Sequence, residues 1–270
     1  MSKILVATDF SEVAKHATHY ACLLAATYHF QVHLVNAHMV PIAFSDTPVP
    51  LLPLDETRQV AEQHMQELIL LLRQDFPNLT ITGECFLGEA VDVLTDCCKE
   101  MLPLMTVLGN SGSADDGAWL GSTVLNGMRQ LSCPVLAVPA GYAFRQIQTI
   151  CLACDNDDLN GGLELETLFR LQQQLNASLE LVYVRRPDTA PPDFEGSRLK
   201  AALAGQALEW HEVSGTDIAE AVHAAAIGMN ADWLAVVPHR HNFIAGLFHK
   251  SQTKAILHES ELPVLALPQK

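Results

Sequence analysis

Short runs of consecutive apolar residues alternate along the chain with longer segments in which apolar residues recur every three or four positions. The short runs are rich in Val, Ile and Leu, which is typical of strands buried on both faces of a parallel sheet. The longer segments have the period of amphipathic helices. This alternation predicts right-handed β–α–β crossovers and a parallel sheet, so the fold class is α/β.

The same order of elements is predicted twice. In the first half of the chain, strands are expected at 3–8, 31–37, 79–86, 104–108 and 134–138, and helices at 12–28, 55–75, 89–99 and 122–131. In the second half, strands are expected at 148–153, 179–184, 208–213, 233–237 and 263–267, with helices at 159–175, 197–205 and 217–229 and a last helix opening at 250.

Corresponding positions in the two halves lie at recurring distances along the chain. Gly109 and Pro238, Ser122 and Ser251, and Pro134 and Pro263 are each 129 residues apart, whereas Asp9 and Asp155 are 146 apart. The missing residues fall in the middle of the second copy, where a proline-rich loop and a long helix are shortened. We therefore predict two tandem domains, 1–142 and 146–270. The link between them is too short for a flexible tether, so the domains are expected to pack against each other.

Composition narrows the classes of partner. Hydrophobic residues make up 49% of the chain and charged residues 17%, which is enough for a large core. A net charge of −15 with only 16 Lys and Arg disfavours nucleic acid and anionic membranes as partners. There is no apolar run of the roughly 20 residues that span a bilayer, and no signal-peptide pattern at the start. The expected location is the cytoplasm.

The seven cysteines are expected to be reduced thiols. Cys151 and Cys154 have the spacing of a redox or metal motif, but they fall in a predicted strand. Residues three apart on a strand point to opposite faces, so we favour a packing role for both.

A glycine-marked loop follows the fourth predicted strand. In an open parallel sheet, ligands bind where the strand order reverses, here between strands 3–8 and 104–108. Asp9 directly follows the first of these strands and Gly109 directly follows the second, so both are expected to face one crevice. Gly109 and Gly112 let backbone amides approach a phosphate, and Gly121 with Ser122 places free amides at a helix start.

The residues that carry this pattern resemble the universal stress protein family. They are the segment 6–11 (VATDFS), the motif Gly109-x2-Gly112-x8-Gly121-Ser122 and the segment 133–138 (CPVLAV). The resemblance covers the chain as two copies and is stronger in the first. It implies two Rossmann-like or flavodoxin-like domains, each a five-stranded parallel sheet of order 3-2-1-4-5. Family domains typically pair through their last strands, and tandem members are expected to do so within one chain.

One branch of the family binds ATP through a motif spaced G-x2-G-x9-G-Ser/Thr, and another branch does not. Carried over by position, Asp9 and the Ala37 backbone would meet adenine, and Gly109 and Gly112 would line ribose and phosphates. Gly121, Ser122 and Thr123 would hold phosphates, and Thr8 completes the expected binding set. The cofactor implied is ATP or AMP, with Mg²⁺ or Mn²⁺ as an open option.

The first copy departs from the motif in its loop. Eight residues, not nine, separate Gly112 from Gly121, and Asp115 and Asp116 lie between them. Two carboxylates repel a triphosphate unless a divalent metal intervenes, and solvated acids in a loop are the simpler interpretation.

The second copy lacks both loop glycines but carries a basic cluster. Pro238 and His241 take the glycine positions, and Lys250 precedes Ser251. The candidate anion site of the second domain comprises Asp155, His239, His241, Lys250 and Ser251. Solvated loop charges, or contacts to the acidic first domain, explain the same cluster.

The leading hypothesis is a stress-response regulatory protein that binds an adenine nucleotide in its first domain, with little or no hydrolysis. No nucleophile–base pair, Walker-type lysine or paired acids are visible, so no catalytic residue is assigned and at most a weak ATPase is expected. No dedicated metal site is assigned. The first alternative is an interaction or scaffold protein that acts through domain pairing, with a homodimer left open. The second is a binder of another small anionic ligand in the second domain.

Overall fold

The computed structural model describes residues 1–39, 54–111, 119–154, 165–185, 193–203, 208–237 and 261–268. The elements of the first half are β1 (Lys3–Ala7), α1 (Glu12–Tyr28), β2 (Gln31–His38), α2 (Leu54–Asp75), β3 (Ile81–Leu87), α3 (Ala90–Met101), β4 (Met105–Asn110), α4 (Trp119–Gln130) and β5 (Val135–Pro139). Those of the second half are β6 (Thr149–Cys154), α5 (Glu166–Leu175), β7 (Ser178–Arg185), α6 (Arg198–Ala202), β8 (Leu208–Ser214), α7 (Ile218–Gly228), β9 (Trp233–Val236) and β10 (Val264–Ala266).

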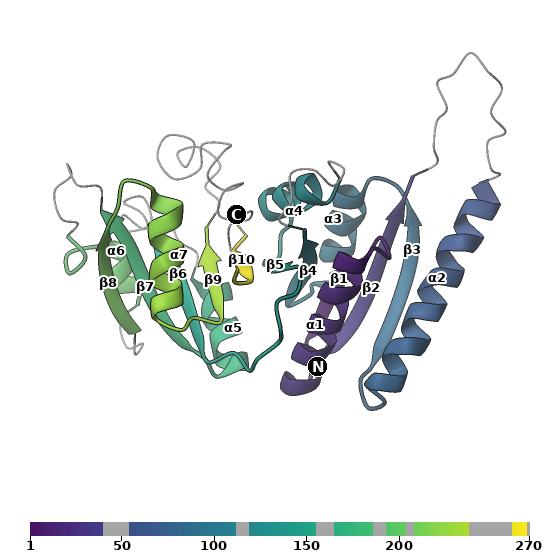
Figure 1. Ribbon diagram of the computed structural model, residues 1–270, viewed down its shortest axis with the longest axis horizontal. Helices are drawn as coiled ribbons and strands as arrows, with labels where there is room; N and C mark the ends of the chain where they lie inside the picture. Colours follow the sequence, from purple (N-terminus) through teal and green to yellow (C-terminus); the bar gives the residue numbers. More distant parts are fainter. Residues whose placement is uncertain are drawn as a thin grey trace, which may run out of the picture.

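The strands form one ten-stranded sheet in the order β3-β2-β1-β4-β5-β10-β9-β6-β7-β8 (Figure 1). Each half has the order 3-2-1-4-5 in its own numbering, and neighbours within each half are parallel. The halves meet where β5 pairs antiparallel with β10, with Leu136 opposite Leu265. The predicted α/β fold class with flanking helices is therefore confirmed.

Side chains alternate between two buried layers, one on each face of the sheet. One layer contains Ile4, Val6 and Leu34 and is covered by α1, α2 and α5. The other contains Leu5 and Val35 and is covered by α3, α4 and α7. Right-handed crossovers that wind outward from β1 in both directions place the helices on opposite faces in this way.

Cys151 and Cys154 follow the same alternation. Both are buried in β6, and they belong to opposite layers. The strand interpretation of this pair is confirmed.

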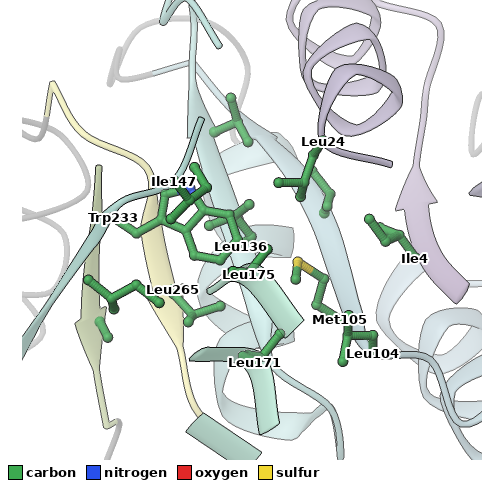
Figure 2. Close-up of a cluster of buried hydrophobic side chains, with 14 of the residues drawn as sticks. Ile4, Leu24, Leu104, Met105, Leu136, Ile147, Leu171, Leu175, Trp233 and Leu265 are labelled. Carbon is green, nitrogen blue, oxygen red and sulfur yellow. The ribbon is translucent and has the colours of Figure 1, made fainter. Parts of the chain in front are cut away.

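The first layer continues across the junction of the halves. Figure 2 shows Leu24 and Leu136 from the first half beside Leu171, Leu175 and Trp233 from the second. Trp233 is fully buried, and its Nε1–H donates to the Tyr20 hydroxyl at 2.8 Å.

The link between β5 and β6 lies against both halves. Tyr142 and Phe144 contact the ring of Tyr20 at centroid distances of 6.2 and 5.3 Å. Arg145 pairs with Asp232, with Nε and Oδ1 2.6 Å apart. The Asp232 carboxylate is buried and also accepts from the backbone N–H groups of residues 148 and 149. These contacts hold the link in place, while the division into domains 1–142 and 146–270 stays a prediction.

Some element boundaries differ from those expected. α4 begins at Trp119 rather than at Ser122. In the sequence, Leu120, Val124 and Met128 are four residues apart, so the helical apolar pattern starts one turn before Val124. α5 begins at Glu166, and the expected positions 159–164 lie outside the described residues. α6 is only five residues long and ends at Ala202. The last expected helix, opening at 250, also lies outside them.

No helix within the described ranges is both long enough and apolar enough to cross a membrane.

Candidate functional site

A pocket lies at the carboxyl end of the first half of the sheet, where the strand order reverses between β1 and β4. Its walls come from the ends of β1, β2 and β4 and from the amino-terminal turns of α1, α3 and α4. The lining residues are Ala7, Thr8, Asp9, Ala14, Val35, Ala37, Ala90, Leu94, Leu108, Gly109, Thr123 and Val124. This is the position at which doubly wound sheets bind ligands.

The turn after β1 fixes Thr8 and Asp9 at the rim of this pocket. The Thr8 hydroxyl accepts from the Phe10 N–H at 3.1 Å, and Asp9 Oδ1 accepts from the Ser11 N–H at 3.0 Å. Phe10 has a φ of 64°, in the left-handed region that non-glycine residues rarely adopt. The buried Asn36 amide donates to the Thr8 carbonyl at 2.8 Å and anchors the turn to β2. The exposed Asp9 carboxylate is thus held in place by local hydrogen bonds.

Gly109, at the end of β4, is needed for packing. A Cβ at this position would lie 2.9 Å from both Val13 Cγ1 and the Val13 carbonyl oxygen. The absence of a side chain therefore lets the first turn of α1 approach β4 closely. The sequence interpretation gave this glycine only the role of approaching phosphate, and the structure adds a structural reason for it.

The interior of the pocket is mostly apolar. Ala7, Val35, Ala37, Leu94 and Leu108 form its walls, while Thr8, Asp9 and Thr123 supply its polar groups. The enclosed volume is about 90 Å³. That is well below the roughly 300–1,000 Å³ of typical small-molecule sites, so these walls enclose only part of such a ligand. No described Lys, Arg or His lines these walls, so they suit an uncharged, largely apolar group better than a phosphate.

The amino end of α4 closes one side. Thr123 and Val124 line the pocket, and Gly121 is the third residue of the helix. The N–H groups in the first turn of a helix lack partners within the helix and carry partial positive charge, which favours an anion nearby. Ser122 is the fourth residue of α4, so it lies inside the helix instead of capping it.

The predicted site residues fall into two groups. Thr8, Asp9, Ala37, Gly109 and Thr123, which come from separate elements, are brought together around this pocket. Gly121 and Ser122 lie in the adjoining first turn of α4. Gly112, with Asp115 and Asp116, lies outside the described residues. So does the whole second-domain candidate set of Asp155, His239, His241, Lys250 and Ser251.

Sequence reasoning missed the apolar walls, most clearly Ala90 and Leu94 of α3. The signal for them was present in the order of elements. Because crossovers are right-handed, the helix before β4 and the helix after it lie on the same face, and α3 therefore borders the crevice beside α4. Val35 and Leu108 point to that face as every second residue of their strands.

A doubly wound α/β sheet with a pocket at the reversal of strand order defines a class of ligand-binding folds. In a comparison with family models, residues 1–139 match the model of the universal stress protein family. The chain belongs to the universal stress protein family. A comparison with curated proteins gave no match.

Solved structures resemble the whole chain. A universal stress protein from Archaeoglobus fulgidus DSM 4304 is 15% identical with a TM-score of 0.74, covering 99% of this chain and 98% of its own. A functionally unknown protein from Pseudomonas aeruginosa PAO1 is 14% identical with a TM-score of 0.58, covering 100% of this chain and 93% of its own. At these identities the likeness establishes the fold alone.

Proposed function

We propose that the pocket beside Asp9 binds an adenine nucleotide, ATP or AMP, and that the protein is a regulatory member of its stress-response family. The observation that carries the proposal is the convergence of Thr8, Asp9, Ala37, Gly109 and Thr123 on one pocket at the switch point of the sheet. Membership of the universal stress protein family supports it.

The chemistry of the walls suggests how the ligand would lie. The adenine ring would occupy the apolar slot between Ala37 and Leu94, with its polar edge toward Asp9. Because the slot holds only part of a nucleotide, the ribose and phosphates would extend toward the first turn of α4. In the sequence, Asp115 and Asp116 come just before that turn. A triphosphate would therefore need a divalent cation, and ATP is expected to bind more tightly with Mg²⁺ or Mn²⁺ than without.

Isothermal titration of the purified chain with ATP, with and without Mg²⁺, and with AMP tests the proposal. Gly121→Asp adds a carboxylate in the first turn of α4 and should abolish binding through repulsion of phosphate. Asn126→Asp is the matched control, since it adds the same charge to an exposed position of the same helix and should leave affinity unchanged.

The absence of any heat at saturating nucleotide would overturn the proposal and favour the interaction-protein alternative. Equal affinity of wild type and Gly121→Asp would show that nucleotide binds somewhere other than this pocket. We expect little or no phosphate release over the titration, because no nucleophile–base pair is present among the described residues that line the pocket.

A further inference from the structure

Three potential metal-ligating side chains converge on β7 and β8, far from the nucleotide pocket. Glu180 on β7 lies opposite Glu209 on β8, and His211 follows two residues later on the same face. One ligand atom from each side chain lies within 4.8 Å of the other two. His211 Nε2 is 3.1 Å from Glu180 Oε2 and 3.8 Å from Glu209 Oε2.

The cluster is partly buried, and one of its three side chains is largely exposed to solvent. The side chains of Glu180 and His211 are 20% and 31% exposed, whereas that of Glu209 is 78% exposed. His211 Nε2 is shielded from solvent and makes no hydrogen bond within the part of the chain that the structure describes. A sheltered ring nitrogen therefore faces two carboxylates that repel each other unless a positive charge lies between them.

Arg185, the basic residue of β7, does not supply a positive charge to this cluster. Arg185 pairs with Glu212 on the opposite face of the sheet, with Nε and Oε1 2.6 Å apart. His211 would have to be protonated to neutralise even one of the two carboxylates. A divalent cation neutralises both and also satisfies the imidazole nitrogen.

The first half of the chain supplies an internal comparison. The register of β2 with β3 matches that of β7 with β8, so His33, Thr82 and Glu84 correspond to Glu180, Glu209 and His211. In the first half the histidine lies on β2 and the glutamate on β3, whereas in the second half the glutamate lies on β7 and the histidine on β8. His33 Nε2 lies 3.9 Å from Glu84 Oε1. The third position is the Thr82 hydroxyl, which contacts His33 Nδ1 at 2.8 Å.

A cross-strand pair of histidine and glutamate therefore occurs at the same place in both halves, and it can serve the sheet without a metal. The second carboxylate, Glu209, occurs only in the second half, where it takes the place of Thr82. It converts a pair into a set of three ligands, which is the number that open zinc sites use with water in the fourth position.

We propose that Glu180, Glu209 and His211 form a binding site for a divalent transition metal of the zinc class, with water completing the coordination. Zinc bonds of about 2.0–2.2 Å in tetrahedral geometry place neighbouring ligand atoms about 3.4 Å apart. The observed separations of 3.1 and 3.8 Å lie on either side of that value. The imidazole ligand favours zinc over Mg²⁺ and Ca²⁺, which prefer all-oxygen sites.

The full-length protein, stripped with a chelator and dialysed, would be titrated with ZnCl₂ by calorimetry. Glu209→Gln removes one ligand while keeping the shape of an exposed side chain, so the fold should be retained. Glu84→Gln makes the same change in the corresponding pair of the first half and is the matched control.

We expect wild type and Glu84→Gln to bind one zinc ion more than Glu209→Gln, or to bind it at least about tenfold more tightly, since even outer-shell changes cost 10–100-fold. The affinity of that ion should fall on acidification, because zinc competes with a proton for the imidazole. Equal stoichiometry and affinity in wild type and Glu209→Gln would overturn the proposal.

Discussion

At the scale of a single residue, Gly109 contributes both to the packing of the fold and to the lining of the candidate site. It lines the pocket, and it also lets the backbone of α1 at Val13 lie within 2.9 Å of where a Cβ would stand. A side chain here meets a backbone carbonyl, which cannot move aside as a flexible side chain can.

We predict that Gly109→Ala lowers the free energy of unfolding by about 1–3 kcal/mol, the usual cost of overpacking. Urea denaturation followed by circular dichroism measures it. Gly228→Ala is the control, because no described atom beyond its chain neighbours and the backbone of its own helix lies within 4 Å of its Cβ position at the end of α7. It should be neutral or stabilising by up to about 1 kcal/mol. Equal effects of the two substitutions would contradict the packing role of Gly109.

His33 is the second residue with a testable role. It is buried on β2, and desolvation lowers the pKa of its imidazole, although the nearby Glu84 carboxylate acts in the opposite direction. The unfolded chain, with a histidine pKa of about 6.5, therefore binds more protons than the folded chain at mildly acidic pH. Stability contributed by neutral His33 is present above about pH 6.5 and is lost as pH falls below it.

The change His33→Gln should therefore reduce the loss of stability between about pH 7.5 and pH 5.5, on either side of the usual imidazole pKa. Urea denaturation of wild type and variant at both pH values gives the difference. If both proteins lose the same free energy of unfolding on acidification, His33 does not carry this dependence.

At the scale of elements, α1 is tied to β9 across the two halves by one buried hydrogen bond. Trp233 Nε1 donates to the Tyr20 hydroxyl at 2.8 Å, and both side chains are at most 1% exposed. Burial also raises the pKa of Tyr20, so its hydroxyl stays protonated.

Tyr20→Phe would leave the indole N–H without an acceptor, and we predict a cost of about 1–3 kcal/mol in the free energy of unfolding. Guanidinium denaturation measures the loss. Tyr142→Phe serves as the comparison, because its half-buried hydroxyl makes a longer contact of 3.5 Å to the Asp232 carbonyl. The interpretation fails if Tyr142→Phe costs as much as Tyr20→Phe.

Hydrophobic patterning predicted the elements well because most strands are apolar runs and most helices are amphipathic. It could not place the start of α4, because Gly121 and Ser122 are typical of a helix start but here lie within the first turns. The predicted ends of two strands identified three residues that line the pocket, Thr8, Asp9 and Gly109. Contacts such as Tyr20 with Trp233 join residues 213 apart in sequence, and no local pattern contains them.

At the scale of the whole molecule, the sheet and one core layer are continuous across both halves. β5 pairs with β10, and Leu24 and Leu136 share a buried layer with Leu175 and Trp233 (Figure 2). A separated half would expose the edge of β5 or β10 and much of this layer to water, at a cost of roughly 25 cal/mol per Å² of apolar surface.

We therefore predict that both halves unfold together. Differential scanning calorimetry should show one transition, with a calorimetric enthalpy equal to the van't Hoff enthalpy. Two resolved transitions would indicate that the predicted domains 1–142 and 146–270 are independent units of stability, despite the shared sheet.

A crystal structure of the chain grown with saturating ATP and Mg²⁺ would show whether the pocket at the switch point holds an adenine nucleotide. We predict density for the base between Ala37 and Leu94, with its edge toward Asp9 and the phosphates directed to the first turn of α4. A nucleotide bound at any other place, or an empty pocket at saturation, would contradict this prediction.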